Sequence, residues 1–480
     1  MTATARPVAR SGSRDRALTV FVVTLAQFMA VMSTSSVSVA LPTIGRDLNA
    51  SSTSLEWIVD AYVIVYASLL IAGGVISDRQ GRKGMFMIGV ALFGLGSLVC
   101  GIAPAVGWLI GGRVIQGLGP AIVTPTSLAI ISATFDDPRE RATAIGVWSS
   151  GSGLALALGP AVGGLLVVAI GWRSLFLLNV PLAAVIIGLG TRLIPRIQRT
   201  RAGARFDWTG AFLTTLGAGL LTFGLIEGPV QGWGSGLIIG SFVLSALGLA
   251  VLVAWESRHE APLIDVSLFR RAPFTVANLA GLTVFFAFIG AIVYLSAYFQ
   301  QVQDRSALGA GVAVLPIGVG FFVGAQLSGR IVGALGPRLP MVVGLGLCGA
   351  AMIGLLRLRS DSPISAVWWD LLAVGFGGGL SLSPMTATAM AAVHSERAGM
   401  ASAVHNSMRQ VGQALGVAVL GSLVYAAVAG GQAGGDRLSG ARAAAFVDGL
   451  HHAVLVSGGC LLAAALLASA LIPAGLLGRA

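Results

Sequence analysis

The chain has 480 residues, of which 55% are hydrophobic and only 10% are charged. Soluble globular proteins carry about 25% charged residues, so this composition excludes that class and indicates a polytopic membrane protein. The net charge of +11 does not indicate nucleic-acid binding, because the basic residues lie in short loops between apolar runs and form no continuous patch.

Fourteen runs in the sequence are apolar and long enough for membrane-spanning helices, which need roughly 17–25 residues. The first run is too long for a cleaved signal peptide, so we expect it to remain as the first helix. The sequence therefore predicts an all-α polytopic membrane protein with 14 transmembrane helices, at approximately 18–41, 55–76, 85–103, 107–131, 142–169, 174–194, 208–226, 235–255, 274–299, 308–331, 340–358, 365–391, 399–428 and 450–472.

The basic residues predict the orientation of these spans. If the N-terminal tail is cytoplasmic, 21 Lys and Arg residues fall in cytoplasmic segments and 7 in outer segments, with Arg113 and Arg409 inside spans. A miscounted span would reverse this asymmetry from that point onward, yet it persists to the end of the chain. We therefore expect a multi-pass protein of the bacterial plasma membrane, with both termini cytoplasmic.

A spacing that recurs in the two halves of the chain suggests an internal repeat. Gly74, Gly81 and Lys83, in the second span and the loop after it, have the same spacing as Gly329, Gly336 and Arg338 in the tenth span and its loop. Parallel repeats place a substrate cavity on their shared axis. We expect a tail at 1–17, a six-helix bundle at 18–194, a linker with inserted helices 7 and 8 at 195–273, a second bundle at 274–472 and a tail at 473–480.

The loop at residues 74–83 is a dense charged turn between two membrane-length runs. Gly74 allows close helix packing, Gly81 permits a positive φ, and Asp78 can pair with a base or cap a helix. A basic loop that only sets topology would not need this pattern, so we favour a functional role. Its candidate residues are Gly74, Asp78, Arg79, Gly81, Arg82 and Lys83.

Ionisable groups inside spans are costly unless they are paired or hydrated, so each is a functional candidate. Asp60 lies in the outer part of the second span with Glu56 one turn away, and neighbouring carboxylates favour holding a proton. Asp60 could carry protons, recognise a cation, or be a hydrated residue at the rim. Arg113 could drive proton release from a nearby acid or serve a structural pairing.

Three further polar features are open to two interpretations. Arg409 could form a second polar site with Asp370, or could serve packing. Ser33 belongs to a serine-rich patch in the first span that either binds substrate or joins helices, the second being the safer interpretation. Glu227, just past the seventh span, is expected to lie in solvent.

The fifth span contains Gly159, Pro160, Gly163 and Gly164. Proline frees a backbone carbonyl and bends a helix, and glycines allow close packing against a neighbour. We interpret this order as a hinge that closes a cavity, rather than as the ordinary use of Gly and Pro in membranes. The sequence has no nucleotide-binding loop, catalytic triad or metal-ligand set, so we expect neither an enzyme nor a cofactor or metal.

Several of these stretches resemble motifs of the major facilitator superfamily, in its 14-helix drug:proton antiporter branch. The loop at 74–83 is similar to the family's hallmark loop. The stretches at 57–62, 113–119, 159–164 and 172–181 resemble its second-, fourth-, fifth- and sixth-helix motifs. The resemblance implies a monomeric transporter whose energy source is the proton gradient and whose partners are protons, lipid and a small amphipathic drug.

One departure from the branch concerns the first span. The family pattern usually has an acid where this chain has Ser33 and an asparagine where it has Ser38. A membrane carboxylate often carries the proton in this branch, so the resemblance does not identify the carrier here.

The resemblance implies secondary active export of an antibiotic or other amphipathic drug by alternating access. The alternatives are a proton-coupled or facilitative transporter of a small metabolite and, from another class, a non-transporting membrane receptor or scaffold. The loops are too short for the extramembrane domains that a receptor would need.

Overall fold

All the regular structure in the described part of the chain is helical. The structure, a computed structural model, describes residues 13–195, 207–259, 264–393, 397–425, 428 and 437–473. Residues 196–206 and 260–263 of the predicted linker and inserted segment at 195–273, most of the N-terminal tail and most of the C-terminal tail lie outside these residues. The main helices are α1 (Ser13–Leu48), α2 (Ser52–Gln80), α3 (Arg82–Gly101), α4 (Val106–Thr134), α5 (Pro138–Ala169), α6 (Ser174–Leu177), α7 (Asn179–Leu193), α8 (Trp208–Gln231), α9 (Gly236–Glu256), α10 (Ala272–Ala297), α11 (Ala307–Leu335), α12 (Arg338–Gly354), α13 (Trp368–Ala391), α14 (Ala398–Tyr425) and α15 (Ala441–Leu471).

Polar caps set where several helices begin. In five helices the side chain of the capping residue accepts a hydrogen bond from a backbone N–H of the first turn. These caps are Ser51 for α2, Asp137 for α5, Asp207 for α8, Ser235 for α9 and Ser306 for α11. Four short 3-10 or π-helical segments complete the described helices: η1 (Val266–Arg270), η2 (Tyr298–Val302), η3 (Leu355–Arg357) and η4 (Ile364–Ala366).

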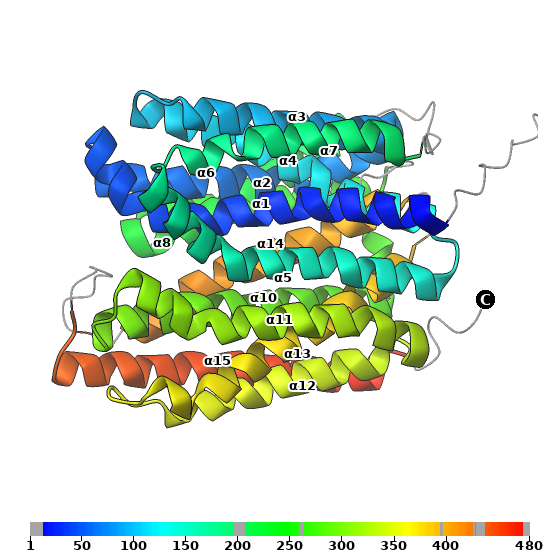
Figure 1. Ribbon diagram of the computed structural model, residues 1–480. Coiled ribbons are helices and arrows are strands. Elements are labelled where there is room, and N and C mark those ends of the chain that lie inside the picture. Colours follow the sequence, from blue (N-terminus) through cyan, green and yellow to red (C-terminus); the bar gives the residue numbers. More distant parts are fainter. Residues whose placement is uncertain are drawn as a thin grey trace, which may run out of the picture.

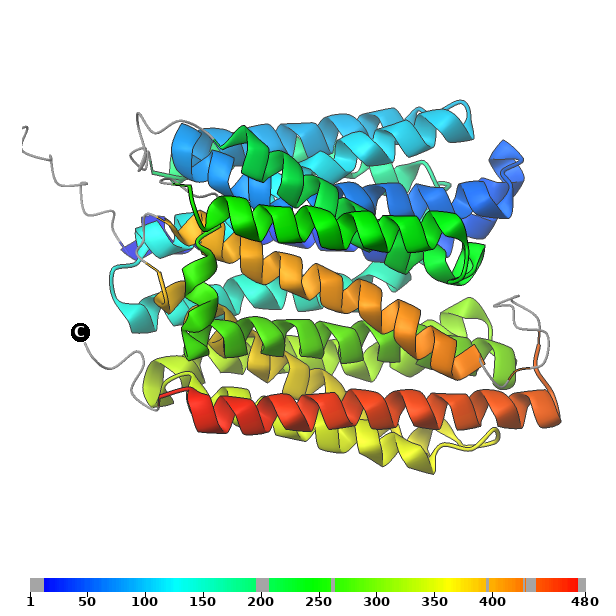
Figure 2. The ribbon, with the colours of Figure 1, turned by 180° about the vertical axis from the view of Figure 1, so that it is seen from behind.

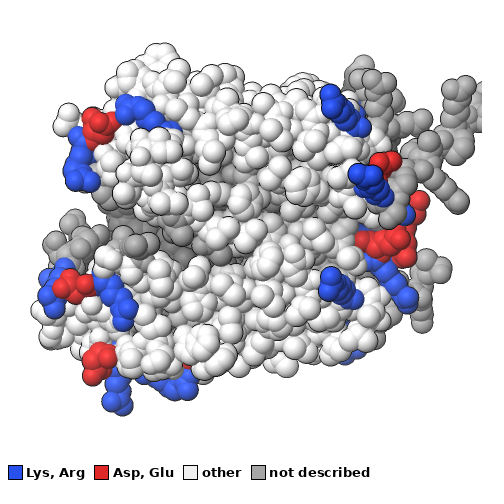
Figure 3. All heavy atoms as spheres, in the orientation of Figure 1, with Lys and Arg blue, Asp and Glu red and all other residues white. Residues whose placement is uncertain are grey.

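Eleven helical segments within the described residues are long and apolar enough to cross a membrane. Every predicted span is occupied by helix, but the three at 142–169, 365–391 and 399–428 are not among the eleven. These are α5, α13 and α14, which pack between other helices and need less apolar surface. Figure 3 shows the charged side chains gathered at two ends, with a broad uncharged band between them.

The same helix pairings occur in the first and last parts of the chain. The pairing of α3 with α4 matches that of α12 with α13, and the pairing of α2 with α4 matches that of α11 with α13. Likewise, α1 with α5 matches α10 with α14, and α3 with α7 matches α12 with α15. In Figure 1 these groups form an upper and a lower lobe, with α5 and α14 between them. The lobes meet mainly through α5 on α11 and α2 on α14, which are again equivalent pairs.

The inserted helices α8 and α9 pack on each other outside the two groups. α8 contacts both α2 and α14, so it lies across the junction of the lobes. Figure 2 shows the pair in green on the back of the molecule, beside the orange α14. Because α9 exposes a long apolar face, with Leu244, Leu247 and Val251 all more than half exposed, its outer side suits contact with lipid.

Candidate functional site

The turn between α2 and α3 is built around Gly81, whose φ of +108° would strain any residue with a side chain. Its N–H bonds the carbonyl of Ser77 at 3.1 Å and ends α2. One turn earlier, Asp78 forms a buried ion pair with Arg82 at 2.9 Å. Arg82 also donates to the carbonyl of Ala129 on α4 at 3.0 Å. The motif therefore locks α2, α3 and α4 together at this end, called the Gly81 end below.

Asp78 also reaches the other lobe. Its Oδ2 accepts from the N–H of Met400 in the first turn of α14, at 3.3 Å. A Cβ on Gly399 would lie 2.4 Å from that oxygen, and a Cβ on Gly74 would lie 2.7 Å from Ala403 Cβ. Both glycines are therefore needed for this approach of α2 to α14.

The equivalent turn in the second lobe makes the equivalent contact with α5. Gly336 has a φ of +77°, and a Cβ on Gly329 would lie 3.0 Å from the carbonyl oxygen of Ala142 on α5. Ser383 on α13 donates to the same carbonyl at 3.1 Å. The lobes are thus in close contact at the Gly81 end through both of their symmetric junctions. At the opposite end, Figure 3 shows the surface hollowed between them.

The other basic residues of the motif also have structural partners. Lys83 Nζ donates to the carbonyls of Thr191 and Ile194 at the end of α7, at 2.8 and 2.7 Å. Arg79 is largely buried. Cations suit the carbonyl end of a helix, so Lys83 attaches α3 to α7.

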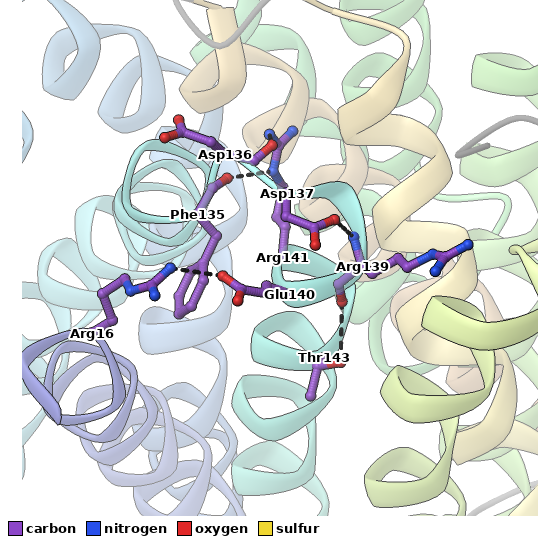
Figure 4. Close-up of polar contacts among 8 residues, drawn as sticks. All are labelled: Arg16, Phe135, Asp136, Asp137, Arg139, Glu140, Arg141 and Thr143. Atoms are coloured by element: carbon purple, nitrogen blue, oxygen red, sulfur yellow. Dashed lines mark hydrogen bonds and ion pairs between the residues drawn. The ribbon is translucent and has the colours of Figure 1, made fainter. Parts of the chain in front are cut away.

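A charged cluster surrounds the start of α5 at this same end (Figure 4). Arg16 on α1 pairs with Glu140 at 2.7 Å, and Asp137 accepts from the N–H of Arg139 at 2.8 Å. Arg139 extends toward α11, where a Cβ built on Gly333 would lie 3.6 Å from the Cβ of Arg139. These contacts hold α1 and α5 together where the lobes meet.

Asp60 is partly buried on α2. Glu56, Glu227 and Arg113 are the charged groups within electrostatic range of it. Glu56 is exposed, whereas Glu227 on α8 is only 3% exposed and accepts from Gln231 Nε2 at 2.7 Å. The expectation that Glu227 lies in solvent is therefore wrong, because α8 continues to Gln231 and carries it against α2.

Arg113 lies at the centre of a buried polar group in the first lobe and has no exposed surface. Its Nε donates to the carbonyl of Ile58 at 2.8 Å and its Nη1 to Gln116 Oε1 at 2.6 Å. The guanidinium lies 4.2 Å over the ring of Tyr62. Ser33 Oγ is 3.5 Å from Nη1, so the structure brings Ser33, Arg113 and Asp60 into one region.

The glycines of the fifth-helix motif pack directly on the serine patch of α1. A Cβ on Gly159 would lie 1.8 Å from Ser35 Oγ, and one on Gly163 would lie 2.9 Å from Ser36 Cβ. Gly164 is less tightly packed, with Val39 Cγ1 at 3.7 Å. Ser35 also bonds the carbonyl of Ala155 at 3.2 Å, so part of the serine patch joins α1 to α5. The side chain of Pro160 lies outside the described ones.

Arg409 occupies the corresponding core of the second lobe. Its Nη1 donates to Asn406 Oδ1 at 2.9 Å and its guanidinium lies 4.1 Å from the centre of the Phe285 ring. The predicted pairing with Asp370 is wrong: Asp370 forms an ion pair with Arg357 near the opposite end of the molecule. Sequence reasoning also missed His405, which is fully buried one turn before Arg409.

At the end opposite to Gly81, the sixth-helix motif closes on the end of α1. Trp172 Nε1 and Arg173 Nη1 donate to Asp47 Oδ2 at 2.9 and 2.7 Å. These hydrogen bonds hold the pKa of Asp47 below its usual range. Across the described residues, no three His, Cys, Asp or Glu side chains are grouped as a metal site would require.

Comparisons with known proteins found a matching family model and several similar sequences. The family model described as Major Facilitator Superfamily matches residues 23–417. The chain is 37% identical over 416 residues to the multidrug resistance protein Stp of Mycobacterium tuberculosis, covering 86% of this chain and 77% of Stp. It is 36% identical over 464 residues to the puromycin resistance protein pur8 of Streptomyces alboniger (94% and 90% covered). It is 34% identical over 425 residues to the tetracenomycin C resistance and export protein of Streptomyces glaucescens (87% and 78%).

Two solved structures share the fold at low sequence identity. The human organic anion transporter MFSD10 (TETRAN) superposes with a TM-score of 0.69 at 16% identity, covering 94% of this chain and 99% of that one. The proton:xylose symporter XylE superposes with a TM-score of 0.64 at 16% identity, covering 97% of each chain.

Proposed function

The chain belongs to the Major Facilitator Superfamily, and from this premise we propose that it exports an antibiotic or other amphipathic drug in exchange for protons. The observation that carries the proposal is the placement of Asp60. This carboxylate is partly buried on α2, among Glu56, Glu227 and Arg113. A carboxylate held beside both acids and a base can gain a proton on one side of the membrane and lose it on the other.

Export rather than uptake is supported by the relatives, which include proteins named for multidrug, puromycin and tetracenomycin C resistance. We expect the substrate to be a small amphipathic compound and the protein to work as a monomer in the bacterial plasma membrane. The proton gradient supplies the energy, with no cofactor or catalytic step.

The mechanism that fits best is alternating access between two six-helix bundles, at 18–194 and 274–472, within fourteen spans with both termini cytoplasmic. The repeated helix pairings and the equivalent contacts of Gly74 and Gly329 support this arrangement. The structure then corresponds to a state closed on the cytoplasmic, Gly81 side. Transport requires the contacts of α2 with α14 and of α5 with α11 to separate while the opposite end closes.

Drug sensitivity of cells tests this function. Drug-hypersensitive cells expressing the wild type should become resistant to at least one amphipathic antibiotic in a panel that includes puromycin. Export in everted vesicles should stop when a protonophore is added. Asp60→Asn should abolish export and its pH dependence, whereas Asp15→Asn, at an exposed position on α1, should leave both unchanged. Export by Asp60→Asn with an intact pH dependence would refute the role of Asp60, and uptake would favour a metabolite transporter.

A further inference from the structure

Arg409 is a buried cation that no carboxylate neutralises within the described residues. It is 6% exposed, and its only hydrogen-bond acceptor is Asn406 Oδ1, which is uncharged. No ion pair of Arg409 occurs in the described part of the chain, and the titratable acid that acts on it is the phenol of Tyr66 on α2. Arg113 differs, because the Asp60 carboxylate lies within range of it.

An uncompensated buried charge is expensive and needs a partner of opposite sign. Arg409 Nε has no hydrogen-bond partner in the structure, although the atom is buried. The Phe285 ring 4.1 Å from the guanidinium stabilises the cation by its quadrupole but accepts no N–H bond. Among the described residues, the Nε–H of Arg409 therefore has no acceptor.

His405, one turn before Arg409 on α14, adds an unsatisfied acceptor. Thr386 Oγ1 gives its single hydrogen to the carbonyl of Leu382 at 2.8 Å, so it accepts from His405 Nε2–H at 3.2 Å. In the neutral imidazole, Nδ1 then carries a lone pair, and it has no partner although His405 is fully buried. Both side chains face Gly281 on α10, where a Cβ would lie 2.9 Å from His405 Cε1 and 3.4 Å from Arg409 Cγ.

The surroundings are shared between the lobes. Tyr66 belongs to α2 of the first lobe, and its hydroxyl bonds Thr124 at 3.1 Å, which in turn donates to Gln27 Oε1 at 3.0 Å. Arg409 and Phe285 belong to α14 and α10 of the second lobe. A ligand between them would meet aromatic rings from both lobes and a single fixed cation.

From this geometry we infer that Arg409 and His405 form a binding site for the acidic group of the transported compound. This inference rests on the proposed export function and specifies its substrate class as amphipathic organic acids. An anionic oxygen of the ligand accepts from Arg409, a neighbouring O–H or N–H donates to His405 Nδ1, and the apolar body lies against Phe285 and Tyr66. The charge of Arg409 is then neutralised only while substrate is bound.

Direct binding to the full-length protein in lipid nanodiscs tests the inference. The probes are pyrene-1-butyrate and its methyl ester, which differ in the negative charge and in one methyl group, and empty nanodiscs correct for partition into lipid. The wild type should bind the acid about 10–100-fold more tightly than the ester, the range expected for a charge-assisted hydrogen bond. Arg409→Gln should remove that preference while leaving the affinity for the ester within about threefold.

Two further variants separate the site from a general loss of structure. Arg409→Lys keeps the charge but loses the planar fork, so it should retain part of the preference. Arg437→Gln, which removes an exposed arginine, should behave as the wild type. If Arg409→Gln cannot be purified folded, the wild type alone still decides: the acid should raise its unfolding temperature more than the ester does. Equal binding or equal stabilisation by the two probes overturns the inference.

Because these measurements need no gradient, they are independent of the export assays. A preference for the acid without proton-driven export would remove the proposed function and leave this site. Export without any preference for the acid would remove this binding site and leave the proposed function.

Discussion

The contact of Asp78 with α14 allows a quantitative prediction for Asp78→Asn. The carboxylate is 5% exposed and accepts from the N–H of Met400, at the positively polarised start of a 28-residue helix. Asparagine keeps the shape and an acceptor oxygen but loses the charge. This should cost about 1–2 kcal/mol of the contact between the lobes. Since 1.4 kcal/mol is a factor of about ten, the closed state at the Gly81 end should become about 5–30-fold less populated relative to the open state.

The ion pair of Asp78 with Arg82 has a different consequence. Both residues belong to the first lobe, so this pair is present whether the lobes are together or apart. Breaking a buried pair costs about 3–5 kcal/mol, and that loss should appear as a lower unfolding temperature in both conformations. It should not by itself move the equilibrium between them.

Distances between spin labels measure that equilibrium directly. Labels at Arg139 on α5 and Arg330 on α11, both exposed, span the junction at the Gly81 end. The wild type should give one short distance, and Asp78→Asn should add a longer population. Asp136→Asn, an exposed acid beside the start of α5, is the control and should change nothing. A lower unfolding temperature with an unchanged distance distribution would refute the reasoning, since Asp78 would then stabilise only its own lobe.

Three smaller predictions follow from other contacts. Gly159→Ala should abolish transport without preventing membrane insertion, because the added Cβ would lie 1.8 Å from Ser35 Oγ. Adding Ser35→Gly to this variant should restore transport. If the double variant stays inactive, packing against Ser35 is not the cause. Ser33→Asp should place a carboxylate beside Arg113 and change the pH profile of export, whereas Ser33→Asn should not; identical profiles would contradict this. The third concerns Asp265: its partial burial is outweighed by hydroxyl and guanidinium donors, which hold its pKa below the usual range. Its stabilisation, about 0.5 kcal/mol, is therefore present at neutral pH and lost progressively below about pH 4, so Asp265→Asn should lower the unfolding temperature more at pH 7 than at pH 3.

The sequence predicted the elements that depend on local signals. Apolar length located the helices, and the positive φ values of Gly81 and Gly336 occur at the two predicted turns. It predicted less well which side chains a buried residue would contact. The positions of helices α13 and α14 were predicted correctly, although these helices lie among other helices and are not among the segments that hydropathy alone selects as membrane-crossing.

Partners across the fold could not be read from spacing. Spacing left open a polar site of Arg409 with Asp370, but Asp370 forms an ion pair with Arg357 instead. Glu227 was placed in solvent because the apolar run ends before it, although α8 continues past it. The buried His405 gave one usable signal, its place one turn before Arg409 on the same helix face.

Counting protons during drug movement tests the central claim most directly. Purified protein in liposomes that contain a pH-sensitive dye would be given a drug gradient and no initial pH gradient. The account predicts that protons move opposite to the drug in a fixed ratio, and that Asp60→Asn binds the drug but moves no protons. Drug movement without a proton flux, or with protons in the same direction, would contradict exchange by this chain.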